Sequence, residues 1–148
     1  MSDLDGLYQE VILDHARRKI GQGDAASFVH QHTEVSPTCG DQMTIGVAVG
    51  ADGAIALAWS GQGCSISTAS ASVMSELLEG ATAAHAHESI DAFRSMMRSR
   101  GAEEPPEFLG DAEVFQGVSK YVMRIKCAML PWVALEAALG HAEAGRPA

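Results

Sequence analysis

Apolar residues recur with helical spacing near the start of the chain, between Leu4 and about Lys19. This spacing predicts an amphipathic helix with one apolar stripe. The stripe consists of Leu4, Leu7, Tyr8, Val11 and Ile12. The break Gly21-Gln22-Gly23-Asp24 ends the helix, and the polar segment that follows, up to Pro37, predicts a loop with one irregular edge strand.

Further along, the hydrophobic pattern changes from helical spacing to alternation. Apolar side chains alternate with small or polar ones between Met43 and Val49, and again between Ile55 and Trp59. The two runs are separated by the turn Ala51-Asp52-Gly53. Two alternating runs joined by such a turn are typical of a β-hairpin with one buried face.

Helical spacing returns in the second half of the chain. The pattern predicts a helix from Ser65 to Glu79, stopped by Gly80, and a second from about Ser89 to Ser99, which ends at Gly101. The stretch from Leu109 to Gly117 predicts a short helix or turn. The run 102–106 is too short to link two domains, so we expect one domain over residues 1–148.

Pro131 constrains the last helix, whose apolar positions include Trp132 and Leu135. Proline is tolerated in the first turn of a helix, where its missing N–H is not needed. We therefore expect this helix to begin between Lys126 and Leu130, which places Cys127 at its N-terminus.

The charge balance narrows the classes of partner. Nineteen acidic and ten basic residues give a formal charge of −9, which argues against binding nucleic acid or an anionic membrane through bulk electrostatics. No apolar run approaches the roughly 20 residues that span a bilayer, and the N-terminus lacks the features of a signal peptide. Three cysteines cannot all pair as disulfides, so the cytoplasm is the expected compartment.

Three cysteines and one aspartate stand out as candidate metal ligands. Cys39 and Asp41 lie in Pro37-Thr38-Cys39-Gly40-Asp41, Cys64 follows Gly61-Gln62-Gly63, and Cys127 follows Arg124-Ile125-Lys126. Three sulfurs and one carboxylate oxygen are the number and kind of donors that tetrahedral zinc accepts. All three cysteines lie at predicted element boundaries, where ligands and catalytic groups concentrate.

The three thiols are expected to differ in role. Cys64 and Cys127 are each predicted at the N-terminus of a helix, where the helix dipole favours the thiolate. Cys39 lies in a loop beside Gly40 and has the freest backbone, so we expect it to be the thiol that leaves the metal and reacts. Two alternatives stay open, because a lone cysteine is usually a small buried hydrophobe and Asp41 could serve only as a turn residue.

The six histidines are rival ligands. The pairs His30/His32 and His85/His87 have an alternating spacing, but we expect both in solvated loops. His15 is expected to make a surface or capping contact on the first helix. The tryptophans, Trp59 and Trp132, and the pair Met96-Met97 are better explained as core residues than as site residues.

Several stretches together resemble the SufU branch of the NifU/IscU-type iron–sulfur cluster assembly proteins. They cover most of the chain and contain the three cysteine motifs in order. These stretches are Leu7–His15, Pro37–Asp41, Gly61–Ser72, Leu109-Gly110-Asp111 and Gly117-Val118 through Arg124–Ala128.

This resemblance implies an α+β fold, in which a small antiparallel sheet of about three strands packs against helices with a metal site at an exposed end. It also implies a zinc-dependent sulfurtransferase, in which Cys39, Asp41, Cys64 and Cys127 hold Zn2+ and Cys39 accepts persulfide sulfur. The implied partners are a SufS-type cysteine desulfurase and a downstream SUF scaffold complex. Two alternatives remain: a scaffold or carrier for an iron–sulfur cluster, and a structural zinc adaptor.

Two departures from the IscU branch favour SufU. IscU-like proteins have a histidine immediately before the third cysteine, where this chain has Lys126. The third cysteine also comes late, which leaves room for an extra region from Ser89 to Pro106. Arg124 and Lys126 are expected to offset the excess negative charge of three thiolates and a carboxylate around one dication.

Overall fold

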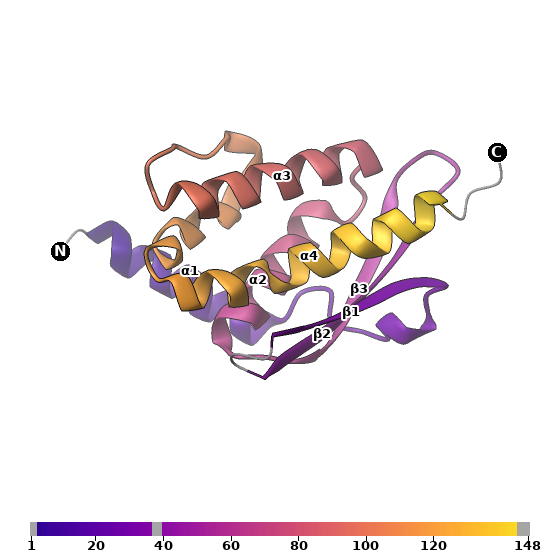
Figure 1. The fold of residues 1–148 in the computed structure, drawn as a ribbon, viewed down its shortest axis with the longest axis horizontal. Coiled ribbons are helices and arrows are strands. Elements are labelled where there is room, and N and C mark those ends of the chain that lie inside the picture. Colours follow the sequence, from indigo (N-terminus) through magenta and orange to yellow (C-terminus); the bar gives the residue numbers. More distant parts are fainter. Residues whose placement is uncertain (1–2, 37–39, 145–148) are drawn as a thin grey trace.

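The computed structural model describes residues 3–36 and 40–144, and the side chains discussed below belong to residues 6–36 and 40–144. The elements follow one another as three strands, four α-helices and three 3₁₀ segments within these ranges (Figure 1). In chain order they are α1 (Asp3–Arg18), η1 (Ala25–Ser27), β1 (His30–Ser36), β2 (Asp41–Val49), β3 (Ile55–Gln62), α2 (Ser65–Leu78), α3 (Ala83–Ser99), η2 (Glu107–Gln116), η3 (Val118–Lys120) and α4 (Val122–Ala144).

The three strands form an antiparallel sheet in the order β1-β2-β3. Met43, Ile45 and Val47 of β2 are buried, as are alternate residues of β3. The hairpin predicted from alternation is therefore confirmed, and its turn at residues 50–54 is closed by a hydrogen bond from the Gly50 N–H to the Ala54 carbonyl. The predicted edge strand is β1, which pairs with β2 over its whole length.

Two of the long helices, α2 and α4, cover one face of this sheet. Helix α4 packs along β1 and β2, and α2 packs against α4, α1 and β3 (Figure 1). Gly46 of β2 lets η1 and Phe28 pack closely against the strand. A Cβ at this position would lie 2.6 Å from the Ala25 carbonyl oxygen and 2.7 Å from the Phe28 ring. The predicted α+β class, with a three-stranded antiparallel sheet packed against helices, is confirmed.

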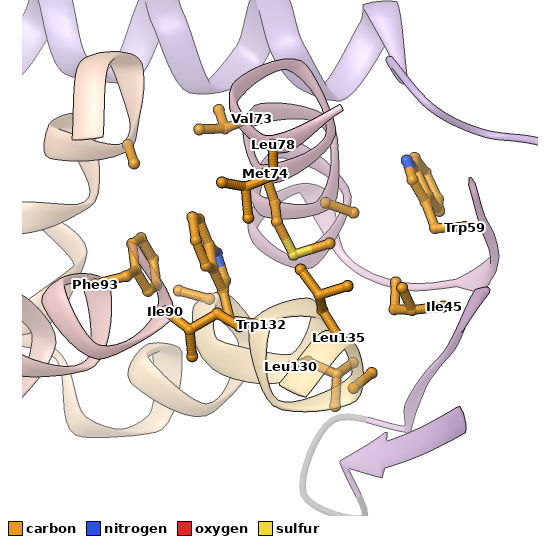
Figure 2. Packing of buried hydrophobic residues seen from close by; sticks show 14 of the residues in the cluster. Ile45, Trp59, Val73, Met74, Leu78, Ile90, Phe93, Leu130, Trp132 and Leu135 are labelled. Atoms are coloured by element: carbon orange, nitrogen blue, oxygen red, sulfur yellow. The ribbon is translucent and has the colours of Figure 1, made fainter. Parts of the chain in front are cut away.

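A continuous apolar core joins the sheet to the helices (Figure 2). Trp132 of α4 stacks on Phe93 of α3, with ring centroids 4.3 Å apart and planes 9° from parallel. Its indole N–H donates to Ser70 Oγ at 2.9 Å, and the indole N–H of Trp59 donates to the Ile20 carbonyl at 2.7 Å. Both tryptophans are therefore core anchors, as predicted, and Met96 and Met97 are also buried.

The predicted start of the last helix is wrong. Helix α4 begins at Val122, so Pro131 lies inside it, and Cys127 lies in its second turn rather than at its N-terminus. Proline inside a helix removes one hydrogen bond to the residue four positions earlier and typically costs about 3 kcal/mol. The fold tolerates this cost because the helix buries apolar residues on both sides of Pro131, including Leu130 and Trp132.

Two expectations about histidine pairs are also wrong. His30 and His32 lie on the regular strand β1, because the strand pairs fully with β2 although its sequence is polar. His85 and His87 lie in α3, which begins at Ala83, before the predicted start at Ser89, and is capped by the Thr82 hydroxyl.

Helices α3 and α4 are also joined by an ion pair. The two guanidinium nitrogens of Arg94 donate to the two carboxylate oxygens of Glu136 at 2.7 and 3.3 Å. This hydrogen bonding raises the pKa of the Arg94 guanidinium. Within residues 3–36 and 40–144, no helix is both long enough and apolar enough to cross a membrane.

His15 does not make the predicted surface contact, because its side chain is 1% exposed. Its Nδ1 lies 2.9 Å from Ser72 Oγ of α2, and its Nε2 lies 3.2 Å from Asp111 of η2. Ser72 Oγ also accepts a hydrogen bond from the Ile20 N–H at 3.0 Å. One buried imidazole thus joins α1 to two other elements, through the buried hydroxyl of Ser72 and the exposed carboxylate of Asp111.

Replacing His15 by Ala should destabilise the protein by about 1–3 kcal/mol, because the buried hydroxyl of Ser72 would lose its hydrogen bond to the imidazole. Urea unfolding followed by circular dichroism measures this loss. His87→Ala is the matched control, since His87 is more than a third exposed and contacts only Glu143 among the described polar side chains; it should change stability by less than about 0.5 kcal/mol. Equal effects of the two substitutions would show that the His15 network does not stabilise the fold.

Candidate metal centre

Three of the four predicted ligands come together in the structure. The ligand atoms of Asp41, Cys64 and Cys127 all lie within 4.8 Å of one another. Asp41 is the first residue of β2, Cys64 is the N-cap of α2, and Cys127 lies in the second turn of α4. The fourth predicted ligand, Cys39, lies outside the described residues.

The donor set fits a zinc ion. Zinc binds sulfur at about 2.3 Å and carboxylate oxygen at about 2.0–2.2 Å, so tetrahedral ligands lie about 3.5–3.8 Å apart. Since the ligand atoms of the three residues lie no more than 4.8 Å apart, they would need to move closer by about 1 Å to bind one ion. Small side-chain rotations are enough for such a movement. A third sulfur would complete four-coordination, and the same soft donors suit iron in a cluster.

Burial differs among the three side chains. Asp41 is 4% exposed and Cys127 is 5% exposed, whereas Cys64 is exposed. The group therefore has a buried side formed by β2 and α4 and an open side at the start of α2. Solvent or a second molecule can reach the open side without any rearrangement of the core.

Both carboxylate oxygens of Asp41 are held by the first turn of α2. Oδ1 accepts a hydrogen bond from the backbone N–H of Cys64 at 3.1 Å, and Oδ2 accepts one from the hydroxyl of Ser67 at 2.5 Å. A carboxylate in this place also interacts favourably with the positive end of the helix dipole. Asp41 is thus oriented toward the thiols rather than toward bulk water.

Glycines let the chain bring Cys64 to this point. Gly61 has φ of 130°, a conformation that L side chains rarely adopt, and a Cβ there would lie 2.2 Å from the Gln42 carbonyl oxygen. At Gly63 a Cβ would lie 2.9 Å from Ser67 Cβ and 3.5 Å from Asp41 Cγ. The Gly-Gln-Gly sequence therefore allows β2 and α2 to approach closely beside the site.

Cys127 reaches the group through the packing of α4 rather than through a local turn. Its Sγ lies 3.9 Å from the Met123 carbonyl, one helical turn earlier. The absence of an N–H at Pro131 removes the hydrogen bond that the Cys127 carbonyl would otherwise receive in the helix. One residue later, the hydroxyl of Ser70 in α2 donates to the Ala128 carbonyl at 2.6 Å, which ties this part of α4 to α2.

The two basic residues before Cys127 lie in different surroundings. The guanidinium of Arg124 lies 5.3 Å from the centre of the Tyr121 ring, and Lys126 lines a groove of about 250 Å³ between β1 and α4. The expectation that both residues offset the charge of the metal site stays a prediction.

Among the described histidines, none joins Asp41, Cys64 and Cys127. His32 contacts Glu34, and His85 contacts Glu88. A second group of possible ligands consists of buried His15 with the exposed carboxylates of Glu76 and Asp111. In this group the imidazole of His15 already has Ser72 and Asp111 as partners.

Sequence reasoning missed Ser67. It is 0% exposed, and it is the only described side chain outside the ligand group shown to hydrogen-bond to both Asp41 and Cys64. Ser67 could have been found from its position three residues after the N-cap Cys64, because the side chain of the third helical residue lies near the N-cap residue.

A methyl group at Gly63 should disturb the metal centre. Gly63→Ala is expected to push Ser67 and Asp41 apart and to lower zinc affinity about tenfold or more. Competition with a chromophoric chelator measures this affinity. Gly140→Ala in α4 is the control, because a Cβ there meets nothing within 4 Å. Wild-type affinity in Gly63→Ala would contradict the close packing.

Comparison with known proteins identifies the family. Residues 7–128 match the family model described as the NifU-like N-terminal domain. The chain is 36% identical over 144 residues to "Zinc-dependent sulfurtransferase SufU" of Bacillus subtilis, covering 97% of both chains. It is 38% identical over 142 residues to "Iron-sulfur cluster assembly scaffold protein IscU" of Streptococcus pyogenes, covering 94% of this chain and 86% of the relative.

A solved structure agrees with these matches. The putative iron–sulfur cluster assembly scaffold protein for the SUF system from Fervidobacterium islandicum superposes with a TM-score of 0.79 at 33% identity, covering 88% of this chain and 94% of that one. The chain therefore belongs to the family of NifU-like N-terminal domains, with SufU and IscU proteins among its relatives.

Proposed function

We propose that this protein is a zinc-dependent sulfur acceptor in iron–sulfur cluster assembly. The observation that carries the proposal is the convergence of Asp41, Cys64 and Cys127, with Cys39 two residues before Asp41 in the sequence. The relative named a zinc-dependent sulfurtransferase, similar over 97% of this chain, supports it. So does Lys126, which stands where IscU-like proteins have a histidine.

In this proposal Zn2+ is held by Cys39, Asp41, Cys64 and Cys127. Zinc keeps thiols deprotonated without redox chemistry and has little geometric rigidity, which lowers the energy needed to exchange a ligand. Asp41 begins β2, Cys64 is the N-cap of α2 and Cys127 lies within α4, so each is fixed by an element of the fold. The fourth ligand, Cys39, lies outside the described residues and is followed in the sequence by Gly40. Cys39 is therefore the thiolate that reacts.

The sulfur donor is the persulfide of a SufS-type cysteine desulfurase. The Cys39 thiolate attacks the terminal sulfur of that persulfide, so that a new sulfur–sulfur bond forms on Cys39 and the bond to the desulfurase cysteine breaks. The desulfurase leaves as a thiolate, and the transfer involves no net oxidation. The sulfur then passes to a downstream SUF scaffold complex.

The surface beside the metal centre supports docking of such a partner. Tyr121 precedes α4 and Val122 and Met123 begin it, four to six residues before Cys127, and each is more than half exposed. Exposed apolar side chains that cluster in this way commonly mark a protein interface. The open side at Cys64 allows a second protein to approach the thiols directly.

Cys39→Ser should leave a folded protein that no longer accepts sulfur. With cysteine and the desulfurase, wild-type protein should increase the rate of alanine production, because its thiolate removes the persulfide sulfur, and it should gain the mass of one sulfur atom. The variant should do neither, while thermal unfolding shows that it is folded. Ser99→Ala, a change far from the site on α3, is the matched control. Full activity of Cys39→Ser would refute this role.

A second candidate function is a scaffold that carries an iron–sulfur cluster. The IscU relative of Streptococcus pyogenes supports this alternative, and three cysteines with an aspartate can ligate a cluster. Anaerobic reconstitution with iron and sulfide separates the two. The sulfur-acceptor proposal expects zinc-loaded protein to stimulate the desulfurase and reconstituted clusters to be lost quickly. A stable, transferable cluster without stimulation would instead favour the scaffold.

A further inference from the structure

The hydroxyl of Ser67 lies at the junction of two prospective metal ligands. Ser67 is the third residue of α2 and is 0% exposed. Its Oγ lies 2.5 Å from Asp41 Oδ2 and 3.6 Å from Cys64 Sγ. No water competes for the hydroxyl at this depth, so its hydrogen bonding is decided by these neighbours.

A serine hydroxyl has one proton to donate, and here two acceptors face it. The short contact to Asp41 indicates that the proton is donated to the carboxylate, while the sulfur remains within reach for a weaker contact. The other oxygen of Asp41 accepts from the Cys64 N–H at 3.1 Å. Each carboxylate oxygen keeps a lone pair for a metal, so these bonds orient Asp41 without blocking it.

The other buried serines of α2 have different partners. Ser70 donates to a carbonyl of α4, Ser72 contacts His15, and Ser75 donates to the Ala71 carbonyl of its own helix. These bonds join helices or stay within one. Among the described serines of α2, Ser67 therefore differs in bonding to residues of the metal centre.

We propose that Ser67 is a positioning residue that, together with the Cys64 N–H, holds the Asp41 carboxylate in a fixed orientation as a metal ligand. This inference rests on the metal site of the proposed function. A carboxylate held at both oxygens remains on the ion when another ligand departs, so the hydroxyl favours exchange of a ligand other than Asp41. Partners that orient metal ligands typically contribute 10–100-fold to metal affinity.

Ser67→Ala removes the hydroxyl and should weaken zinc binding by about 10–100-fold, measured by competition with a chromophoric chelator. Cobalt loading supplies a readout that a purely structural role would not move. Its visible absorption bands report ligand geometry, and they should shift in Ser67→Ala because Asp41 is no longer oriented. Ser67→Thr keeps the hydroxyl and should restore both affinity and spectrum.

Ser75→Ala is the matched control, because it removes a buried hydroxyl from the same helix without touching the metal centre. It should bind zinc and cobalt as the wild type does. Unchanged affinity and spectrum in Ser67→Ala would overturn the proposal, and so would equal losses in Ser67→Ala and Ser75→Ala. These measurements need no desulfurase, so their failure is distinct from a failure of sulfur transfer by Cys39.

Discussion

The carboxylate of Asp41 at the N-terminus of α2 is the contact on which the metal centre depends. A negative charge that is 4% exposed would be strongly destabilising without partners, because burial removes its hydration. Here both oxygens accept hydrogen bonds from the first turn of α2, and the helix dipole adds a favourable field. These bonds also tie the start of β2 to the start of α2, so one interaction stabilises the buried charge and determines how Asp41 and Cys64 lie relative to each other.

Cys127 is brought to this pair by the packing of a long helix. Trp132 stacks on Phe93 and donates to Ser70, whose own hydroxyl donates to the Ala128 carbonyl next to Cys127. The bond from Ser70 lies within one turn of Pro131, where the helix lacks a backbone donor. The core therefore positions Cys127, and the helix does not need an unbroken hydrogen-bond ladder at that turn.

Local patterns predicted the parts of the fold that local sequence controls. The β2–β3 hairpin and the N-terminus of α2 at Cys64 follow from alternation, glycine and helical spacing within short windows. The start of α4 was missed because a local rule about proline was outweighed by burial of apolar residues along the whole helix. The burial of His15 was missed because its partners, Ser72 and Asp111, lie 57 and 96 positions away.

For the candidate site, the sequence predicts which residues are ligands but not how deeply each one is buried. Residue type was enough to select Asp41, Cys64 and Cys127 as candidates, because sulfur and carboxylate donors are recognisable without coordinates, and Asp41 and Cys64 also lie beside glycine. Nothing in the sequence indicates that Asp41 is buried and Cys64 exposed, since burial depends on how α2 and α4 pack against β2. That asymmetry matters for the chemistry. A site closed on all sides holds its ion in place, whereas a site whose buried side is rigid and whose other side is open can exchange one ligand while keeping the rest.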